Sequence, residues 1–233
     1  MGGPTGGPSF NVGGMGTVNQ ATLQDLFQSY MNALTKPNVS TYEMEIPKAS
    51  WLRTWVGVIG VDIVSFLIGL IFAGLAFAQV SSALAQLHAQ GIYQYDSLVS
   101  FFAGGGGVVT AVVGLIITPL RFFIGAGILW LAARMFGGTN SNFMTHSYLL
   151  SLSYTPLRII GTVIGIIPIL GALVSFAAFL YQLYSAGLAM QASQRMQPGR
   201  AQLAAFLPLI VGILLACLCG VILIFLAAAT INR

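Results

Sequence analysis

The sequence predicts an all-α protein: a polytopic transmembrane helical bundle of five spans, preceded by a flexible tail and a short amphipathic helix. Two observations predict this fold class. Of the 233 residues, 57% are hydrophobic and only 6% are charged, whereas about a quarter of the residues in soluble domains are charged. The hydrophobic residues also gather in runs long enough to cross ~30 Å of hydrocarbon as helices.

We expect the chain to divide into three regions. Residues 1–20 are rich in Gly and Pro and lack the charged start and apolar core of a secretory signal, so they predict a flexible tail. Residues 21–50 predict a cytoplasmic amphipathic helix followed by a linker. Residues 51–233 predict the transmembrane domain.

The amphipathic helix is predicted by apolar residues at the spacing of one helical face, ended by Pro37. It could lie on the bilayer, dock on the bundle or bind a partner. Its few basic residues count against the bilayer surface, and docking on its own chain is the favoured alternative. The predicted face consists of Leu23, Leu26, Phe27, Tyr30, Met31 and Leu34.

The first span begins at an interfacial group of aromatic and cationic residues, Trp51, Arg53 and Trp55. Pro119 is expected to kink the second span rather than divide it, because the remaining piece would be too short to cross. The tight link from Pro168 to Gly171 predicts a hairpin of the third and fourth spans. The five spans are expected at about residues 55–78, 108–131, 148–167, 170–189 and 203–229.

Small residues recur at four-residue spacing in two of the spans. Ser65, Gly69 and Ala73 form such a stripe in the first span, and Gly161 and Gly165 form a pair in the third. Small residues at this spacing let helix backbones approach closely in membranes. We therefore expect both sets to pack against other helices.

Three charged residues lie within the spans: Asp62, Arg121 and Arg158. At 1.5 Å per residue, Asp62 and Arg158 fall at similar depths on the first and third spans, and Arg121 lies near the same plane. Because an unpaired charge in the bilayer is costly, we expect an Asp62–Arg158 pair with Arg121 as a second donor. The alternative is arginines that snorkel to the headgroups beside a neutral, hydrogen-bonded Asp62.

Basic residues indicate the orientation. With five spans, all cations outside the spans except Arg233 fall on one side of the membrane, and cytoplasmic loops are enriched in Lys and Arg. We therefore expect a cytoplasmic N-terminus and a C-terminus on the opposite side. The residues on the cytoplasmic side would be Lys36, Lys48, Arg53, Arg134, Arg195 and Arg200.

A sequence motif extends from the end of the second span to the start of the fourth. A helix ends in Ala-Arg-x-x-Gly-Gly at Arg134, Gly137 and Gly138, a loop with Asn142 and Phe143 follows, and the next helix carries Ser-Tyr-x-Pro. The remaining motif residues are Tyr154, Pro156, Pro168 and Gly171.

This arrangement resembles the Yip domain family, the Ypt-interacting membrane proteins and their bacterial relatives, over residues 49–228. Eukaryotic members carry an Asp-Leu-Tyr-Gly-Pro-like motif ahead of the first span, and this chain has none. The resemblance therefore favours the bacterial branch over a GTPase-binding member, and implies a bacterial plasma membrane.

The sequence contains no motif for catalysis, and we expect no catalytic, cofactor-binding or metal-binding residues. Cys217 and Cys219 are two apart in an apolar run and point to different sides of a helix, so they predict packing residues rather than a metal site. No basic and aromatic residues interleave as a nucleic-acid surface would need.

Three functions remain open. The first, which the family resemblance supports, is a membrane scaffold or adaptor that binds other membrane proteins. The second is a small transporter or channel that uses Asp62, Arg121 and Arg158. The third is an accessory subunit of a larger membrane complex. The expected partners are the lipid bilayer and other membrane proteins, and a homo-oligomer is compatible with the sequence.

Overall fold

A computed structural model describes residues 20–91, 107–139, 142–165 and 167–231. Within these ranges every regular element is a helix. Most of the predicted tail, residues 1–19, lies outside the described residues. The elements are α1 (Gln20–Thr35), α2 (Val39–Glu45), the short 3-10 helix η1 (Ile46–Lys48), α3 (Trp51–Ala89), α5 (Gly107–Met135), α6 (Phe143–Ile164), α7 (Pro168–Gln194) and α8 (Pro198–Ile231).

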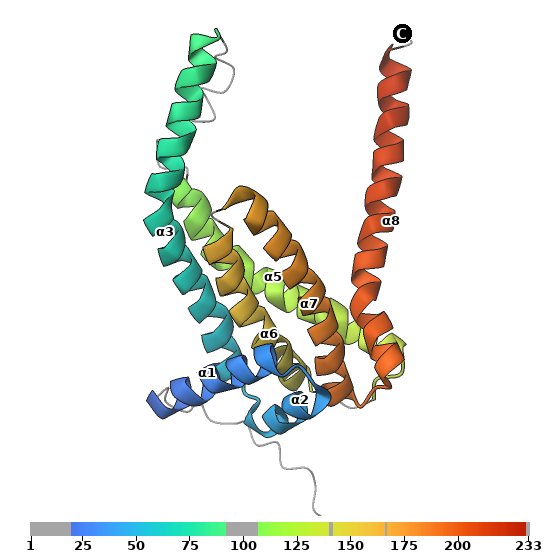
Figure 1. Ribbon diagram of the computed structural model, residues 1–233. Coiled ribbons are helices and arrows are strands. Elements are labelled where there is room, and N and C mark those ends of the chain that lie inside the picture. Colours follow the sequence, from blue (N-terminus) through green and yellow to red (C-terminus); the bar gives the residue numbers. More distant parts are fainter. Residues whose placement is uncertain (1–19, 92–106, 140–141, 166, 232–233) are drawn as a thin grey trace, which may run out of the picture.

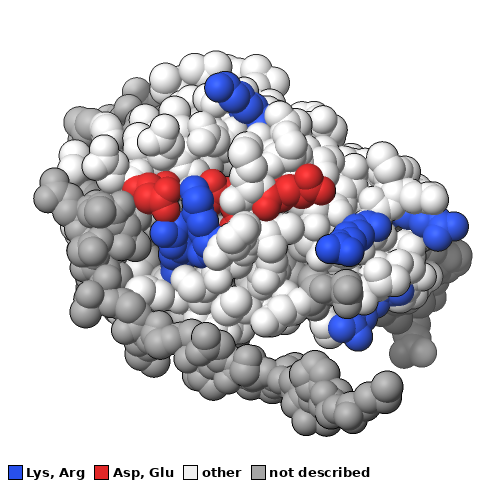
Figure 2. Space-filling view, turned by 90° about the horizontal axis from the view of Figure 1, so that it is seen from below, with Lys and Arg blue, Asp and Glu red and all other residues white. Residues whose placement is uncertain are grey.

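The five long helices run in alternating directions, and the two short ones lie across one end of them (Figure 1). The helices α3, α6 and α8 start at the end covered by α1 and α2, whereas α5 and α7 finish there. The described charges other than those within the helix bundle gather at this end, as Figure 2 shows in the view from below. We call it the charged end.

Four helices in the described part of the chain, rather than the five expected, are long and apolar enough to cross a membrane. The helix that differs is α6, which carries the third predicted span. Its first half is rich in Ser, Thr, His and Tyr, and residues 146–153 are buried on all sides. These polar groups are tolerated because α6 packs between α3 and α7 and faces protein rather than lipid there. The four candidate spans are Trp51–Phe72, Val112–Met135, Ile169–Gln194 and Pro198–Val221.

The first span is longer than expected, whereas two other predicted features of the helices are confirmed. α3 continues to Ala89, well beyond residue 78, where the first span was expected to end. α5 passes through Pro119 as one helix, as the sequence predicted. α6 and α7 form the expected tight hairpin, and a Cβ added to Gly171 would lie only 2.7 Å from the Cα of Gly165.

Helix α1 docks on its own chain, but with a different face from the predicted one. Leu26 and Tyr30 are buried as expected, and Ser29 and Ala33 join them. The predicted residues Leu23, Phe27 and Met31 are 49%, 65% and 40% exposed. The buried face is therefore rotated toward Ser29, because polar contacts described below decide which side of α1 meets the bundle.

The closest contact between α1 and the bundle is made by Tyr30. Its hydroxyl lies directly over Gly57 of α3, where an added Cβ would overlap it and would also lie 3.4 Å from Thr155 Oγ1 of α6. Burial raises the pKa of Tyr30 to about 12, so the hydroxyl stays neutral. The absence of a side chain at Gly57 thus lets α1 reach both α3 and α6.

This contact predicts opposite effects for two alanine substitutions in α3. Gly57→Ala should displace Tyr30 and lower the free energy of unfolding by about 1–3 kcal/mol, as overpacking does. Gly60→Ala is the matched control, because nothing lies within 4 Å of its added Cβ and alanine favours a helix by about 0.5–1 kcal/mol.

Thermal unfolding in detergent and hydrogen exchange of residues 20–35 would measure both effects. Faster exchange of α1 in the Gly57→Ala protein alone is the expected result. Equal exchange in the two variants would show that Tyr30 does not hold α1 through Gly57.

Candidate functional site

A buried carboxylate, Glu45 at the end of α2, joins three elements at the charged end. It is 4% exposed. Its Oε2 accepts hydrogen bonds from Ser29 Oγ of α1 (2.8 Å) and from the Tyr148 hydroxyl of α6 (3.0 Å). Its Oε1 pairs with Lys48 Nζ at 3.0 Å. Both oxygens are therefore satisfied, as a buried carboxylate requires.

Asp25 of α1 extends this set of contacts to α3. Its Oδ2 lies 2.7 Å from Arg53 Nη2, and its Oδ1 lies 3.2 Å from Lys48 Nζ. The two carboxylates and the two cations balance in charge. We call these six residues the Glu45 network: Asp25, Ser29, Glu45, Lys48, Arg53 and Tyr148.

The pairing keeps Asp25 and Lys48 of the Glu45 network ionised over a wide pH range. Partial burial alone would raise the pKa of Asp25, but hydrogen bonds from Arg53 and Lys48 outweigh it and hold the pKa below the usual 3.8. Partial burial alone would lower the pKa of Lys48, but hydrogen bonds to Glu45 and Asp25 raise it above 10.5. The stability from these two groups is thus fully present from about pH 4 to pH 10, and is lost only outside that window.

Helices α1 and α2 form a layer across the charged end, and two tyrosine hydroxyls hydrogen-bond this layer to α7. The Tyr42 hydroxyl of α2 is hydrogen-bonded to Ser185 Oγ, and burial raises its pKa to about 12. The Tyr181 hydroxyl of α7 lies 3.2 Å from the Ala33 carbonyl and 2.7 Å from the Leu34 carbonyl. These carbonyls lie in the last turn of α1, where no helical N–H follows to bond them. The layer is therefore held by α3, α6 and α7 together.

Within the bundle, Asp62 of α3 and Arg158 of α6 lie together. Arg158 Nε is 3.9 Å from Asp62 Oδ1, and the Asp62 side chain is 4% exposed. The other oxygen, Oδ2, is buried without a hydrogen-bond partner among the described residues. One turn further along, Thr162 Oγ1 lies 3.2 Å from Ser65 Oγ. Polar contacts thus line the seam between α3 and α6.

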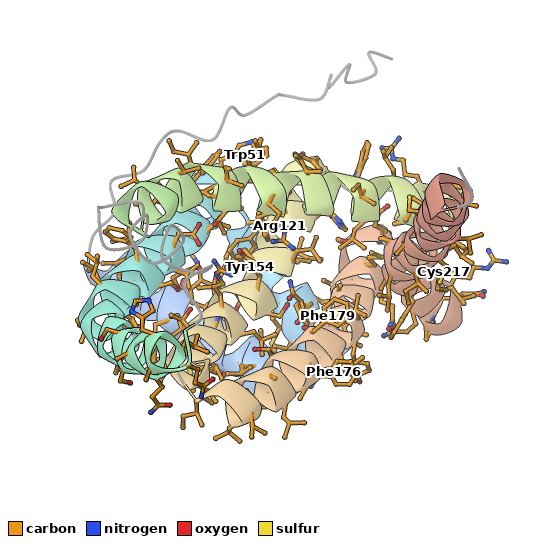
Figure 3. The ribbon with its side chains drawn as sticks, turned by 90° about the horizontal axis from the view of Figure 1, so that it is seen from above. Trp51, Arg121, Tyr154, Phe176, Phe179 and Cys217 are labelled. Carbon is orange, nitrogen blue, oxygen red and sulfur yellow. The ribbon has the colours of Figure 1, made fainter. Side chains whose placement is uncertain are left out.

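Arg121 does not join this pair. It is exposed on α5, and in the described part of the chain no ion pair links it to Asp62. Figure 3 shows Arg121 on the side of α5 that faces Tyr154 of α6. The expected second donor to Asp62 is therefore absent from the described contacts.

The two glycines after Arg134 form a tight turn against α7. Gly137 has φ +88°, a left-handed conformation that favours glycine. A Cβ on Gly138 would lie 2.6 Å from Gln194 Oε1 and 2.9 Å from the Ala133 carbonyl oxygen. The Thr139 N–H donates to the Gln194 carbonyl at 3.4 Å. This part of the predicted motif thus joins the end of α5 to the end of α7.

The other motif residues lie along α6 and at its hairpin. The Tyr154 ring packs on Phe122 of α5 with centroids 4.9 Å apart. Pro156 lies inside α6, and Pro168 is in the first turn of α7. Together with Gly171 at the hairpin, they set the path of α6 between α5 and α7.

The family model of the Yip1 domain matches residues 31–229, from the last part of α1 almost to the end of α8. The chain belongs to the Yip1 domain family. It is an integral membrane protein with apolar helices, and the family resemblance of the sequence is confirmed. No curated protein and no solved structure matches it.

In this Yip1 domain, the predicted small-residue positions differ in their surroundings. Ser65 faces Thr162, as described above. Nothing lies within 4 Å of a Cβ added to Gly69 or Gly161, and a Cβ on Gly165 meets mainly the carbonyl of Gly161 in its own helix. The side chain of Ala73 lies outside the described residues. Among the described residues, close approach occurs at Gly57, at the hairpin where Gly171 meets the Cα of Gly165, and at Gly187, where an added Cβ would overlap Gln202 of α8.

Sequence reasoning missed most of the Yip1 domain's buried polar groups. Glu45 and Lys48 have the i, i+3 spacing of a helical ion pair, which was a usable signal. No sequence pattern links Glu45 to Ser29 or Tyr148. His146, which belongs to none of the predicted sets of residues, is fully buried in α6, with Nδ1 3.4 Å from Ser193 Oγ of α7.

A double-mutant cycle tests the Asp62–Arg158 contact. Asp62→Asn and Arg158→Gln should each lower thermal stability in detergent, and the double variant should lose less than the sum, with a coupling of about 0.5–3 kcal/mol. The physical reason is that each single change leaves one charge uncompensated in an apolar environment.

Arg121→Gln serves as the control in the same cycle. Because it forms no described ion pair with Asp62, its effect should add to that of Asp62→Asn. Additive losses for Arg158→Gln as well would count against a direct interaction.

Proposed function

We propose that this Yip1-domain protein is a non-enzymatic membrane scaffold or adaptor that binds other membrane proteins through α8. One observation supports the proposal above all others: among the α8 side chains that the structure describes, residues 198–221, the buried ones all lie near the start of the helix. Ala201, Ala204 and Ala205 are buried against the bundle near the base. From Val211 to Cys219 every side chain is exposed.

The exposed part of α8 is apolar on every side. Leu214 is 63% exposed, and Leu215 and Leu218 are each 56% exposed. Figure 3 shows α8 standing apart from α7, with Cys217 on its exposed part. Lipid alone could cover this surface, but one side of the helix has a shape suited to another helix.

That side is formed by Gly212, Ala216 and Gly220, at four-residue spacing. Nothing lies within 4 Å of a Cβ added to either glycine. Small residues at this spacing allow a second transmembrane helix to approach closely, and packing of this kind drives helix association in membranes. The stripe therefore supports a protein partner in the plane of the membrane, which could be a second copy of the chain.

A second function, a small transporter, is favoured by one observation. Asp62 Oδ2 is buried among the helices without a described hydrogen-bond partner, and intramembrane carboxylates often bind transported ions. Purified protein in liposomes would test it. Ion flux that Asp62→Asn abolishes without loss of stability would favour a transporter over a scaffold.

We place the charged end in the cytoplasm of a bacterial cell. The cations outside the bundle that lie in described residues all belong to this end, and the cytoplasmic ends of spans are enriched in Lys and Arg. The missing Asp-Leu-Tyr-Gly-Pro-like motif supports the bacterial branch of the family. The C-terminus then lies on the side opposite the N-terminus.

The scaffold function predicts that bulk added to the small-residue side of α8 prevents association. Gly212→Leu with Gly220→Leu should remove proteins that co-purify with the tagged chain from detergent-solubilised membranes, measured by quantitative mass spectrometry. The fold should survive, because no other described part of the chain lies within 4 Å of a Cβ added to either glycine.

The control is Leu214→Phe with Leu218→Phe, which adds bulk on the opposite side of α8 and should leave the partners in place. Light scattering of the purified chain would identify a second copy as the partner. A wild-type chain that purifies alone and monomeric would contradict the scaffold function.

The orientation is tested by cysteine labelling in a chain with Cys217→Ala and Cys219→Ala. An impermeant reagent added to intact cells should reach a cysteine at Gln90 or after Arg233, and should miss one at Asn140 or Gln197. Labelling of a cysteine at Gln197 from outside would show that the protein has the opposite orientation.

A further inference from the structure

Three arginines lie at the charged end on the side away from the Glu45 network: Arg134 at the end of α5, Arg195 just after α7, and Arg200 in the first turn of α8. All three are exposed. Whereas Arg53 and Lys48 are paired with carboxylates, none of these three forms an ion pair with any described residue. We call them the arginine cluster.

The turn after α5 brings the arginine cluster together. The Gly137 N–H donates to the Arg134 carbonyl, and Arg200 Nη1 lies 3.5 Å from the position of a Cβ on Gly137. The Thr139 N–H bonds to Gln194, the neighbour of Arg195. One turn of four residues is thus in contact with the ends of all three helices that carry the arginines.

The charge distribution of the charged end is uneven. Figure 2 shows acidic and basic groups intermixed on one side of this face, and several basic groups with no acidic group among them on the other. The chain has five carboxylates against nine Lys and Arg. Two of the five belong to the Glu45 network and a third is Asp62 in the bundle. Of the remaining two, Glu43 forms no ion pair with the arginines, and Asp96 lies outside the described residues. Within the described part of the chain, no carboxylate is therefore paired with the arginine cluster.

The surroundings of the arginine cluster are those of a membrane boundary. Arg134 stacks on the Trp130 ring at 4.1 Å, and Trp is enriched at the level of lipid headgroups. Apolar side chains of the same helices are exposed beside the arginines: Leu131 (57%) and Met135 (78%) of α5, and Leu203 (57%) of α8. A molecule bound there meets guanidinium groups at one end and an apolar surface at the other.

We infer that the arginine cluster binds the phosphate group of an anionic phospholipid, whose acyl chains lie along the exposed apolar residues of α5 and α8. Guanidinium groups bind phosphate through paired N–H donors. Basic groups between helices at the cytoplasmic boundary are suited to anionic headgroups. The adjoining apolar surface favours a lipid over an acidic protein segment, which would bind the charges but leave Leu131, Met135 and Leu203 uncovered.

The test is native mass spectrometry of the full chain in detergent, titrated with phosphatidylglycerol or with zwitterionic phosphatidylcholine. The wild-type chain should bind phosphatidylglycerol more tightly. Arg134→Gln with Arg195→Gln and Arg200→Gln should weaken that binding about ten- to a hundredfold and leave phosphatidylcholine binding unchanged. Lys36→Gln, which removes an exposed cation elsewhere on the charged end, should leave the preference intact.

Three outcomes would overturn the inference. Equal binding of the two lipids by the wild-type chain would exclude a headgroup site. Full competition by inorganic phosphate would indicate a site for a free anion. Loss of a co-purified acidic protein from the triple variant, with lipid preference unchanged, would indicate a protein partner.

A salt titration keeps the test decisive if the triple variant fails to fold. Raising the salt concentration from about 0.05 M to about 0.5 M should weaken phosphatidylglycerol binding by the wild-type chain, because salt screens exposed charges. A preference that does not change with salt would overturn the electrostatic basis of the inference.

Discussion

The polar first half of α6 is the constraint on which the rest of the bundle depends. A helix with His146, Ser147, Ser151 and Ser153 within eight residues cannot face hydrocarbon without leaving polar groups unsatisfied. α3 and α7 cover it along its length, α5 covers it through Tyr154, and α1 covers its start. The apolar surfaces of the outer helices are then left to face lipid.

The Glu45 network shows how polar groups can decide the position of an apolar helix. Burying Leu23, Phe27 and Met31 would remove more apolar area from water than burying Ser29 and Ala33. The carboxylate of Glu45, however, needs the Ser29 and Tyr148 hydroxyls, and leaving a buried charge without them costs several kcal/mol. The polar requirement therefore sets the rotation of α1.

Much of this fold followed from the sequence because long apolar runs and Gly or Pro breaks determine where membrane helices begin and end. The hairpin at Gly171, the single helix through Pro119 and the family membership could all be predicted. The surroundings of α6 and the orientation of α1 could not, because both depend on contacts between residues far apart in the chain. Tyr148 and Glu45 are 103 positions apart. The periodicity of a short stretch of sequence cannot predict a contact between residues so far apart. For the same reason Asp62 and Arg158 were matched by depth, whereas the separation of Arg121 from them was not foreseen.

The attachment of α8 has a mechanical consequence. Its first two turns are fixed by the contact between Gly187 and Gln202, and Pro208 follows, which cannot donate a helical hydrogen bond to the Ala204 carbonyl. Beyond the proline, the helix to Ile231 forms a lever arm of roughly 35 Å. A change of tilt by about 10° at the proline would move the far end of such an arm by about 6 Å. Because only the part of α8 beyond Pro208 would tilt, the same helix could pack against neighbouring helices of different diameter. The rest of the bundle would not have to change.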